Sequence, residues 1–238
     1  GILAGVLCGV INGFIVTVLR VNPTIATLGT LAAFAGAAFL LAPDGKPIGV
    51  VTQPQFTWLA QGRFFTNLPV PPLGGSNWTG IPVLTVILLL VALLAHILMT
   101  YTDFGRSIYA IGGNSSSALM MGINVRRVKF LTYLLDGFLA GLGGFLFCLN
   151  SCSGFVEQAK GLEMDAISAS VIGGTLLSGG VGLPIGTLFG VLIKGTIASL
   201  ITTQGTLSSW WVRIVLSALL MFFIVLQAIF AKMSMKKK

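Results

Sequence analysis

The sequence predicts an all-α polytopic membrane protein, and two observations predict it: a composition poor in charge and a series of long apolar runs. Of the 238 residues, 55% are hydrophobic and 8% are charged, with a mean hydropathy of +0.97. A soluble domain is roughly 25% charged, so this chain cannot cover a folded surface with polar groups. We therefore expect lipid to surround it. The 31 glycines fit this environment, because small residues let helices approach closely in a bilayer.

Seven apolar runs approach the roughly 20 residues that a helix needs to cross the hydrocarbon layer. The fifth run, "DAISASVIGGTLLSGG", is short and rich in glycine, which favours a broken or partly re-entrant helix. Non-helical backbone at membrane depth is tolerated only where protein or a cavity covers it. The seven predicted spans are residues 1–19, 23–42, 81–100, 130–150, 166–181, 184–204 and 208–230.

The distribution of Lys and Arg predicts the orientation of these spans, because short cytoplasmic loops are enriched in both residues. Residues 101–129 carry three arginines and one lysine against a single aspartate, and the tail 231–238, "AKMSMKKK", is also basic. We expect both segments to be cytoplasmic. Four crossings between them satisfy this condition, so charge favours a complete crossing by 166–181.

The same topology places residues 43–80 outside the membrane, as a periplasmic loop over the outer mouth. This loop holds six prolines and five Phe or Trp residues, and so many prolines exclude a continuous helix. The chain begins inside an apolar run, without a methionine or a basic leader. We expect an N-terminally truncated single transmembrane domain over 1–238.

Five polar residues in or beside the spans are candidates for lining a substrate pathway, since an ionisable group inside a span is costly unless it has a partner or a cavity. Asp136 and Lys194 lie roughly 9 and 15 Å into their spans at 1.5 Å per residue, and we hypothesise that they pair or share a polar cavity; the alternative is a purely structural ion pair. Glu163 and Asp165 complement a helix N-terminus or line the outer entrance. Asn12 bonds a neighbouring helix or contacts the substrate.

Several classes of function find no support in the sequence. It contains no GxxxxGK[ST] loop, no TVGYG filter, no arginine-rich voltage sensor and no HExxH or GxSxG motif, so we expect no catalysis on this chain. Its three cysteines form no CxxC pair, so we expect no metal site. The net charge of +8 lies in loops and tail, which indicates membrane topology and attraction to lipid headgroups rather than nucleic acid.

The basic loop contains a short segment with an unusual surface. After "GGN", which predicts a sharp turn, the residues "SSSALMMGI" predict a brief helix capped by Asn114 or Ser115. Its Leu and Met residues exceed what solubility requires, so we expect them to fill a groove on a partner protein. The alternative is an amphipathic segment that rests on the inner leaflet.

Three stretches resemble the ribose-type permease family of bacterial ABC importers. They are "GRSIYAIGGNSSSALMMGINVRRVK", "NPTIATLGT" and "LEMDAISASVIGGTLLSGGVGLPIGTLFG", in the order 105–129, 22–30 and 162–190. "GTLLSGGVG" and "GTLSSWW" look most like the galactofuranose-type permeases. The departures are Asp136 and Lys194, where the family has small, apolar or amide residues, and Ser117, where it has alanine.

The resemblance implies a bacterial inner-membrane permease of roughly ten helices, of which this fragment holds about seven. Its partners would be an ABC ATPase, a second permease subunit that is identical or a paralogue, and a periplasmic sugar-binding protein. The permease would bind no cofactor itself, because ATP and Mg²⁺ belong to the ATPase. The ATPase-coupling loop would comprise Gly112, Gly113, Asn114, Ala118, Met121, Gly122 and Ile123.

The expected function is import of a monosaccharide, a pentose, a hexose or galactofuranose, by the transport subunit and without bond chemistry on this chain. Two alternatives remain open. The first is an ABC permease for branched-chain amino acids. The second is an ATP-independent secondary carrier, for which Asp136 and Lys194 would form the ion site.

Overall fold

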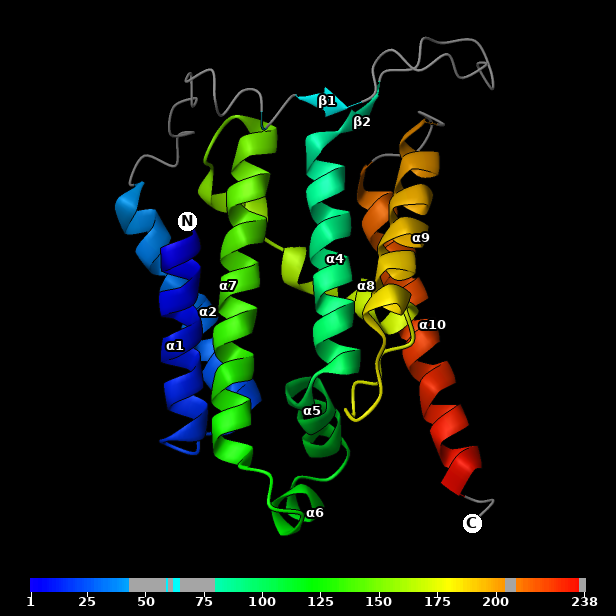
Figure 1. Ribbon diagram of the computed structural model, residues 1–238. Coiled ribbons are helices and arrows are strands. Elements are labelled where there is room, and N and C mark those ends of the chain that lie inside the picture. The colour runs from blue at the N-terminus through cyan, green and yellow to red at the C-terminus, as the bar shows by residue number, and fades with distance from the viewer. Residues whose placement is uncertain (43–58, 60–61, 65–79, 204–208, 236–238) are drawn as a thin grey trace. The chain divides into compact units, whose positions relative to one another are not determined.

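The computed structural model describes residues 1–42, 59, 62–64, 80–203 and 209–235 (Figure 1). Most of the predicted periplasmic loop 43–80 and the last three lysines lie outside these residues. The regular elements of the described chain are helices and one antiparallel pairing of two-residue strands. It divides into two compact units, Gly1–Val91 with Asn124–Lys160 and Ala92–Ile123 with Gly161–Lys238.

Six of the seven predicted spans each correspond to one long helix, the exception being 166–181, and the all-α fold class is confirmed. Pro23 and Pro184 each begin a helix, where the fixed φ of proline suits the first turn. The elements are α1 (Ile2–Thr17), α2 (Pro23–Leu41), β1 (Arg63–Phe64), β2 (Ile81–Pro82), α4 (Val83–Tyr101), α5 (Asp103–Gly113), α6 (Ser115–Met120), α7 (Val125–Ser151), the 3₁₀ helix η1 (Val156–Ala159), α8 (Leu162–Ile172), α9 (Pro184–Thr203) and α10 (Ser209–Met235).

Within the described residues, four helices are long and apolar enough to cross a membrane: α2, α4, α7 and α9. The α1 helix, with 16 residues, is shorter. The α10 helix has 27 residues, of which Ser217–Gln227 form a described apolar stretch.

The fifth predicted span is a broken helix. The α8 helix has 11 residues, which cover about 16 Å at 1.5 Å per residue, against roughly 30 Å of hydrocarbon. The chain continues from Gly173 to Leu183 without helical structure. The break falls at "GG", Gly173–Gly174, where helix propensity is lowest apart from proline.

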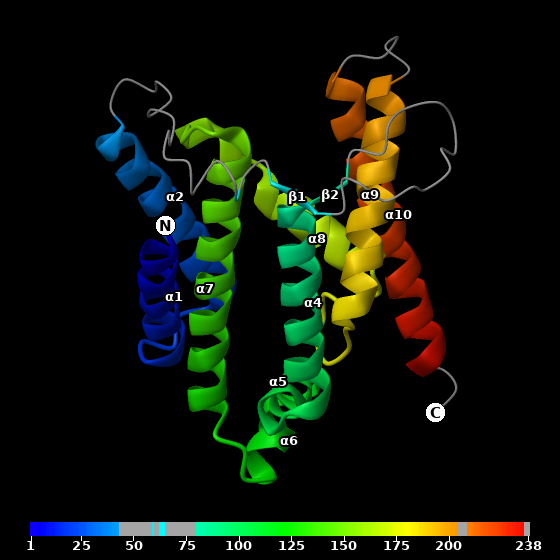
Figure 2. The ribbon, with the colours of Figure 1, turned by 45° about the horizontal axis from the view of Figure 1, so that its top comes forward.

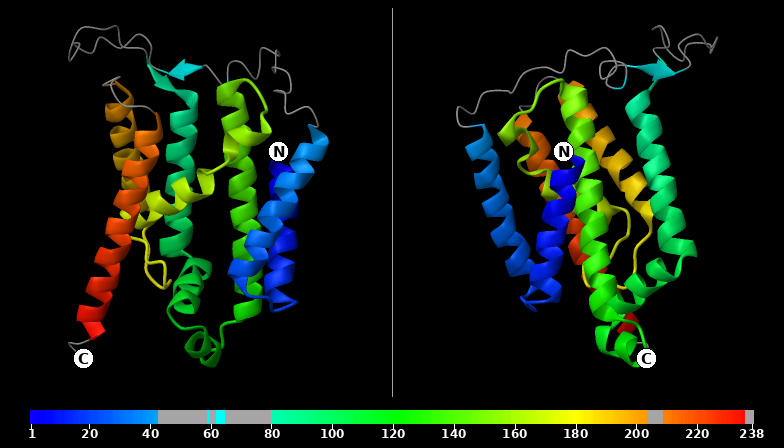
Figure 3. Two further views of the ribbon diagram at one scale, coloured as in Figure 1. Left: turned by 180° about the vertical axis from the view of Figure 1, so that it is seen from behind. Right: turned by 60° about the vertical axis from the view of Figure 1, so that its left-hand side comes forward.

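In the first unit, α1 packs along α7, and α2 lies beside α1 (Figures 1 and 3). The α1–α7 contact consists of glycines spaced four residues apart. A methyl group added to Gly5 would lie 2.5 Å from the Gly137 carbonyl oxygen, and one added to Gly9 would lie 2.6 Å from the Tyr133 carbonyl oxygen. The two backbones therefore touch, which only glycine permits here.

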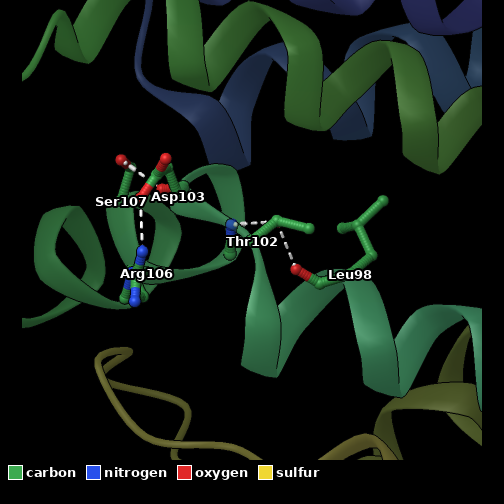
Figure 4. Close-up of polar contacts among 6 residues, drawn as sticks. Leu98, Thr102, Asp103, Arg106 and Ser107 are labelled. Carbon is green, nitrogen blue, oxygen red and sulfur yellow. Dashed lines mark hydrogen bonds and ion pairs between the residues drawn. The ribbon is translucent and has the colours of Figure 1, made fainter.

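In the second unit, α8, α9 and α10 pack against one another (Figure 2), and α5 turns sharply away from the end of α4. Thr102 stabilises this turn, since its hydroxyl donates to the Leu98 carbonyl at 2.6 Å and accepts from the Gly105 amide at 3.2 Å (Figure 4). A side chain at Gly105 would collide with the α4 backbone around Leu98 and Met99. Asp103 forms an exposed ion pair with Arg106.

Candidate functional site

The short helix predicted in the basic loop is present as α6. Asn114 is its N-cap, and its side-chain oxygen accepts from the amides of Ser116 at 3.0 Å and Ser117 at 3.1 Å. These bonds satisfy donors that have no partner inside the helix. Of the two predicted caps, Asn114 is therefore the one that the structure uses.

The C-terminal end of α6 is closed just as tightly. The amide of Gly122 donates to the Leu119 carbonyl, and the amide of Ile123 donates to the Ala118 carbonyl. This is the Schellman arrangement, which requires a left-handed residue after the cap, and Gly122 has φ +82°. Of the remaining predicted coupling residues, Gly112 and Gly113 end α5, and Gly112 lies against the backbone of Gly179 and Gly180.

The exposed surface of α6 is apolar at one end. Leu119, Met120 and Met121 are 64%, 82% and 67% exposed, whereas Ala118 is fully buried. Ala118 therefore anchors the helix while its neighbours project. A capped six-residue helix that presents three large apolar side chains is a compact docking surface, and we call Leu119–Met121 the apolar tip.

The charged candidates in the spans do not pair as hypothesised. Lys194 on α9 forms an ion pair with Asp165 on α8, with Nζ and Oδ1 2.6 Å apart. Asp165 therefore takes the place that we predicted for Asp136 in the ion pair, whereas a polar cavity shared by Asp136 and Lys194 stays a prediction. Asp136 lies on α7, in the other compact unit, and is exposed on the described chain. The prediction compared only how deep Lys194 and Asp136 lie in their spans. The packing of α8 on α9 decides the partner instead, and it brings Asp165 to Lys194.

The α8–α9 contact explains this choice. Its small residues face one another in antiparallel register: Gly173 meets Gly186, and Ala169 meets Gly190. One further step of four residues along each helix brings Asp165 to Lys194. The ion pair thus closes one end of a contact that the small residues set.

The other two polar candidates have local partners. Glu163 Oε2 accepts from the Gly161 amide at 3.0 Å in the first turn of α8, as expected for a carboxylate at a helix N-terminus. The Thr30 hydroxyl lies 2.6 Å from Asn12 Oδ1 and donates to it, which joins α2 to α1.

A protein-family model described as "Branched-chain amino acid transport system / permease component" matches residues 1–224. The chain belongs to this permease family. No solved structure matches it.

Curated relatives of this permease agree with the resemblance to ribose-type ABC importer permeases. The inner membrane ABC transporter permease protein YjfF of Escherichia coli K12 is 38% identical over 226 residues, which are 95% of this chain and 65% of that protein. The ribose import permease protein RbsC of Bacillus subtilis 168 is 40% identical over 187 residues, 78% of this chain and 53% of that protein. The L-arabinose transport system permease protein AraH of E. coli K12 is 32% identical over 187 residues, 79% of this chain and 52% of that protein.

The chain spans about one half to two thirds of the length of these relatives. Together with its apolar helices, the relationship makes it a multi-pass inner-membrane protein. The sites named above are thus part of a permease.

Two residues of this permease that matter to the arrangement were not predicted. Gln227 on α10 donates from Nε2 to the carbonyls of Val171 at 3.3 Å and Thr175 at 3.2 Å, at the break of α8. The Tyr109 hydroxyl on α5 donates to the Gly182 carbonyl at 2.7 Å. For Gln227 a signal existed, because an amide inside the predicted span 208–230 needs a partner.

Proposed function

We propose that this chain is the membrane-spanning transport subunit of an ABC importer that moves a monosaccharide into the cytoplasm, and that the apolar tip of α6 docks into its ATPase. The observation that carries the docking proposal is α6 itself. The Asn114 side chain caps this short helix at its N-terminal end, backbone hydrogen bonds close its C-terminal end, and Leu119, Met120 and Met121 are exposed. Exposed Met side chains adapt well to a partner groove.

The relatives support a monosaccharide as the substrate. They include import permeases for ribose, L-arabinose and fructose. The family description names branched-chain amino acids, so that alternative shares the architecture. The named sugar permeases that resemble this chain favour a pentose or hexose, and the motifs "GTLLSGGVG" and "GTLSSWW" extend the set to galactofuranose.

The permease itself would perform no bond chemistry. ATP hydrolysis on the partner would supply the free energy, and the permease would alternate between two conformations that the partner biases. A periplasmic binding protein would deliver the sugar, and a second permease subunit, identical or paralogous, would complete the pathway.

Replacement of Met121 by glutamate tests the docking site. Met121→Glu should abolish co-purification of the full-length permease with its ATPase, because a carboxylate in an apolar groove loses hydration without gaining a partner. Met121→Leu keeps an apolar side chain of similar size and should retain the ATPase. Both variants should insert into the membrane equally, since residue 121 is exposed.

ATPase retention by Met121→Glu at the level of the unmodified permease would remove the docking assignment. The substrate class is tested separately with the cognate periplasmic binding protein. It should bind one of ribose, arabinose, fructose or galactofuranose in calorimetry and should not bind leucine. Leucine binding would instead select the amino-acid permease, and uptake that survives deletion of the ATPase would select a secondary carrier.

A further inference from the structure

The α5 helix does more than carry α6, because it also contacts the non-helical segment that follows α8. Three backbone contacts join them. A methyl group on Gly112 would lie 2.6 Å from the Gly180 nitrogen, one on Gly179 would lie 2.7 Å from the Gly112 oxygen, and one on Gly180 would lie 2.8 Å from the Gly113 Cα. The two backbones therefore meet without intervening side chains.

The segment 173–183 can make this approach because of its own glycines. Gly179 and Gly180 have φ +87° and +81°, a conformation that L side chains rarely adopt. The Gly179 amide donates to the Leu176 carbonyl, and the Leu176 amide donates to the Val181 carbonyl. These bonds make the segment a defined turn, which we call the glycine turn (Leu176–Gly182).

Tyr109 adds the side-chain contact. Its hydroxyl donates to the Gly182 carbonyl at 2.7 Å and spans 73 positions of the sequence. Tyr109 lies three residues before Gly112 on α5, so the tyrosine and the glycines share one face of the helix and contact the glycine turn together. The non-helical segment after α8 runs beside α5 in Figure 1.

The other end of this segment is tied to the helices of the same unit. Gln227 on α10 holds the carbonyls of Val171 and Thr175, and Gly173 touches Gly186 on α9. An unbroken series of contacts therefore leads from α6 through α5 and the glycine turn to the broken helix α8. Such contiguous contacts are the physical means by which two distant sites can be coupled.

We infer that Tyr109 is a positioning residue that transmits movement of the ATPase-docking helix to the broken helix α8. This inference rests on the proposed function, since it needs an ATPase that pulls on α6. It adds to that proposal the side chain that transmits the movement, Tyr109, and the helix that responds to it, α8. Because the glycine turn contacts α5, both lie on the same side of the membrane. The topology predicted from charge requires this if residues 166–181 cross completely, since that topology puts α5 in the cytoplasm.

The experiment uses the full-length permease assembled with its ATPase in inside-out membrane vesicles. All cysteines of the full-length permease, Cys8, Cys148 and Cys152 among them, are replaced by alanine. Ser178→Cys then supplies one reporter on the glycine turn, where Ser178 is exposed. The probe is a membrane-impermeant maleimide, and its reaction rate is measured with and without Mg²⁺ and a non-hydrolysable ATP analogue. Co-purification of the ATPase is measured in parallel.

Nucleotide should change the labelling rate when Tyr109 is present, and we call the ratio of the rates with and without nucleotide the nucleotide-dependent factor. Tyr109→Phe removes only the hydroxyl. It should reduce this factor roughly five-fold, the effect of one typical hydrogen bond, while the ATPase still co-purifies. Tyr101→Phe is the matched control, because Tyr101 is 72% exposed and its ring contact with His96 survives. Gly112→Ala should raise the labelling rate without nucleotide, since the added methyl displaces the glycine turn.

An unchanged nucleotide-dependent factor in Tyr109→Phe would overturn the inference, as would a labelling rate that nucleotide never alters. Loss of the ATPase from Tyr109→Phe would also overturn it, because Tyr109 would then serve docking itself. Failure of the unmodified permease to bind any ATPase would refute the proposed function, and this outcome is distinguishable from the others.

Discussion

The two helix contacts rich in small residues, α1 with α7 and α8 with α9, use the same spacing for different purposes. In α1–α7, Gly5 and Gly9 bring together two helices that are continuous along the contact. In α8–α9, the small residues end at the Asp165–Lys194 pair, and α8 stops after 11 residues.

The difference shows what a break in a membrane helix requires. A continuous helix satisfies its own backbone groups, so α1–α7 needs no polar side chain at the contact. A broken helix interrupts the regular series of amide-to-carbonyl bonds, and Gln227 adds a side-chain donor to the carbonyls of Val171 and Thr175 at the break. Polar residues in the spans of the second unit therefore mark the places where backbone or charge needs a partner.

The largest expected effect on stability comes from a large side chain at the glycine contact between α1 and α7. Gly9→Leu places a branched side chain where even a methyl group would lie 2.6 Å from the Tyr133 carbonyl, so α1 and α7 must separate. We expect a loss of about 3 kcal/mol in stability, measured as a lower Tm and a lower yield of monodisperse full-length permease in detergent. Gly143→Leu on α7 is the control, since nothing lies within 4 Å of a methyl group there. Equal Tm values for the two variants would show that close packing of α1 on α7 does not stabilise the permease.

A smaller effect is expected from the ion pair. Asp165→Asn leaves Lys194, whose side chain is 14% exposed, without its carboxylate, which is 50% exposed. We expect a loss of about 2 kcal/mol, less than for a fully buried pair because water reaches Asp165. The double variant Asp165→Asn/Lys194→Met should recover most of it, because no buried charge remains.

Asp103→Asn is the matched control for Asp165→Asn, because its ion pair with Arg106 is exposed on both sides. It should leave thermal stability nearly unchanged. A double variant that is no more stable than Asp165→Asn would mean that the pair does not hold α8 on α9.

The sequence predicted helix positions better than it predicted partners. The predicted spans 23–42 and 184–204 begin at the residues where α2 and α9 begin, and Asn114 was one of two predicted caps, because helix ends depend on residues only a few positions apart. The partner of Lys194 depended on which helices pack together and in which register. That information lay in the four-residue spacing of small residues on each segment, Ala169 with Gly173 and Gly186 with Gly190. This spacing indicates a contact only when both segments are considered together.

The Tyr109–Gly182 contact had no such signal. Tyr109 belongs to the motif that carried the family resemblance, but a tyrosine in a polar loop predicts no particular acceptor. Its partner is a backbone carbonyl in a turn that exists only because α8 breaks and Gly179 and Gly180 adopt positive φ. Long-range contacts to irregular backbone therefore stay beyond pattern-based prediction.

The smallest expected effect concerns Gln227, and it distinguishes the two helix contacts most directly. Gln227→Met keeps the length of the side chain and removes its donors from Val171 and Thr175, which should cost about 1 kcal/mol. This change should appear as faster hydrogen–deuterium exchange of the amides at the α8 break, such as Gly174 and Thr175, which bond the carbonyls of Val171 and Ser170. Amides of α7 in the same sample provide the reference, because the Gln227 amide bonds the backbone at the α8 break. Uniform acceleration across α7 and α8 would mean that Gln227 stabilises the whole permease rather than the broken helix; no acceleration at either place would mean that water or another donor replaces it.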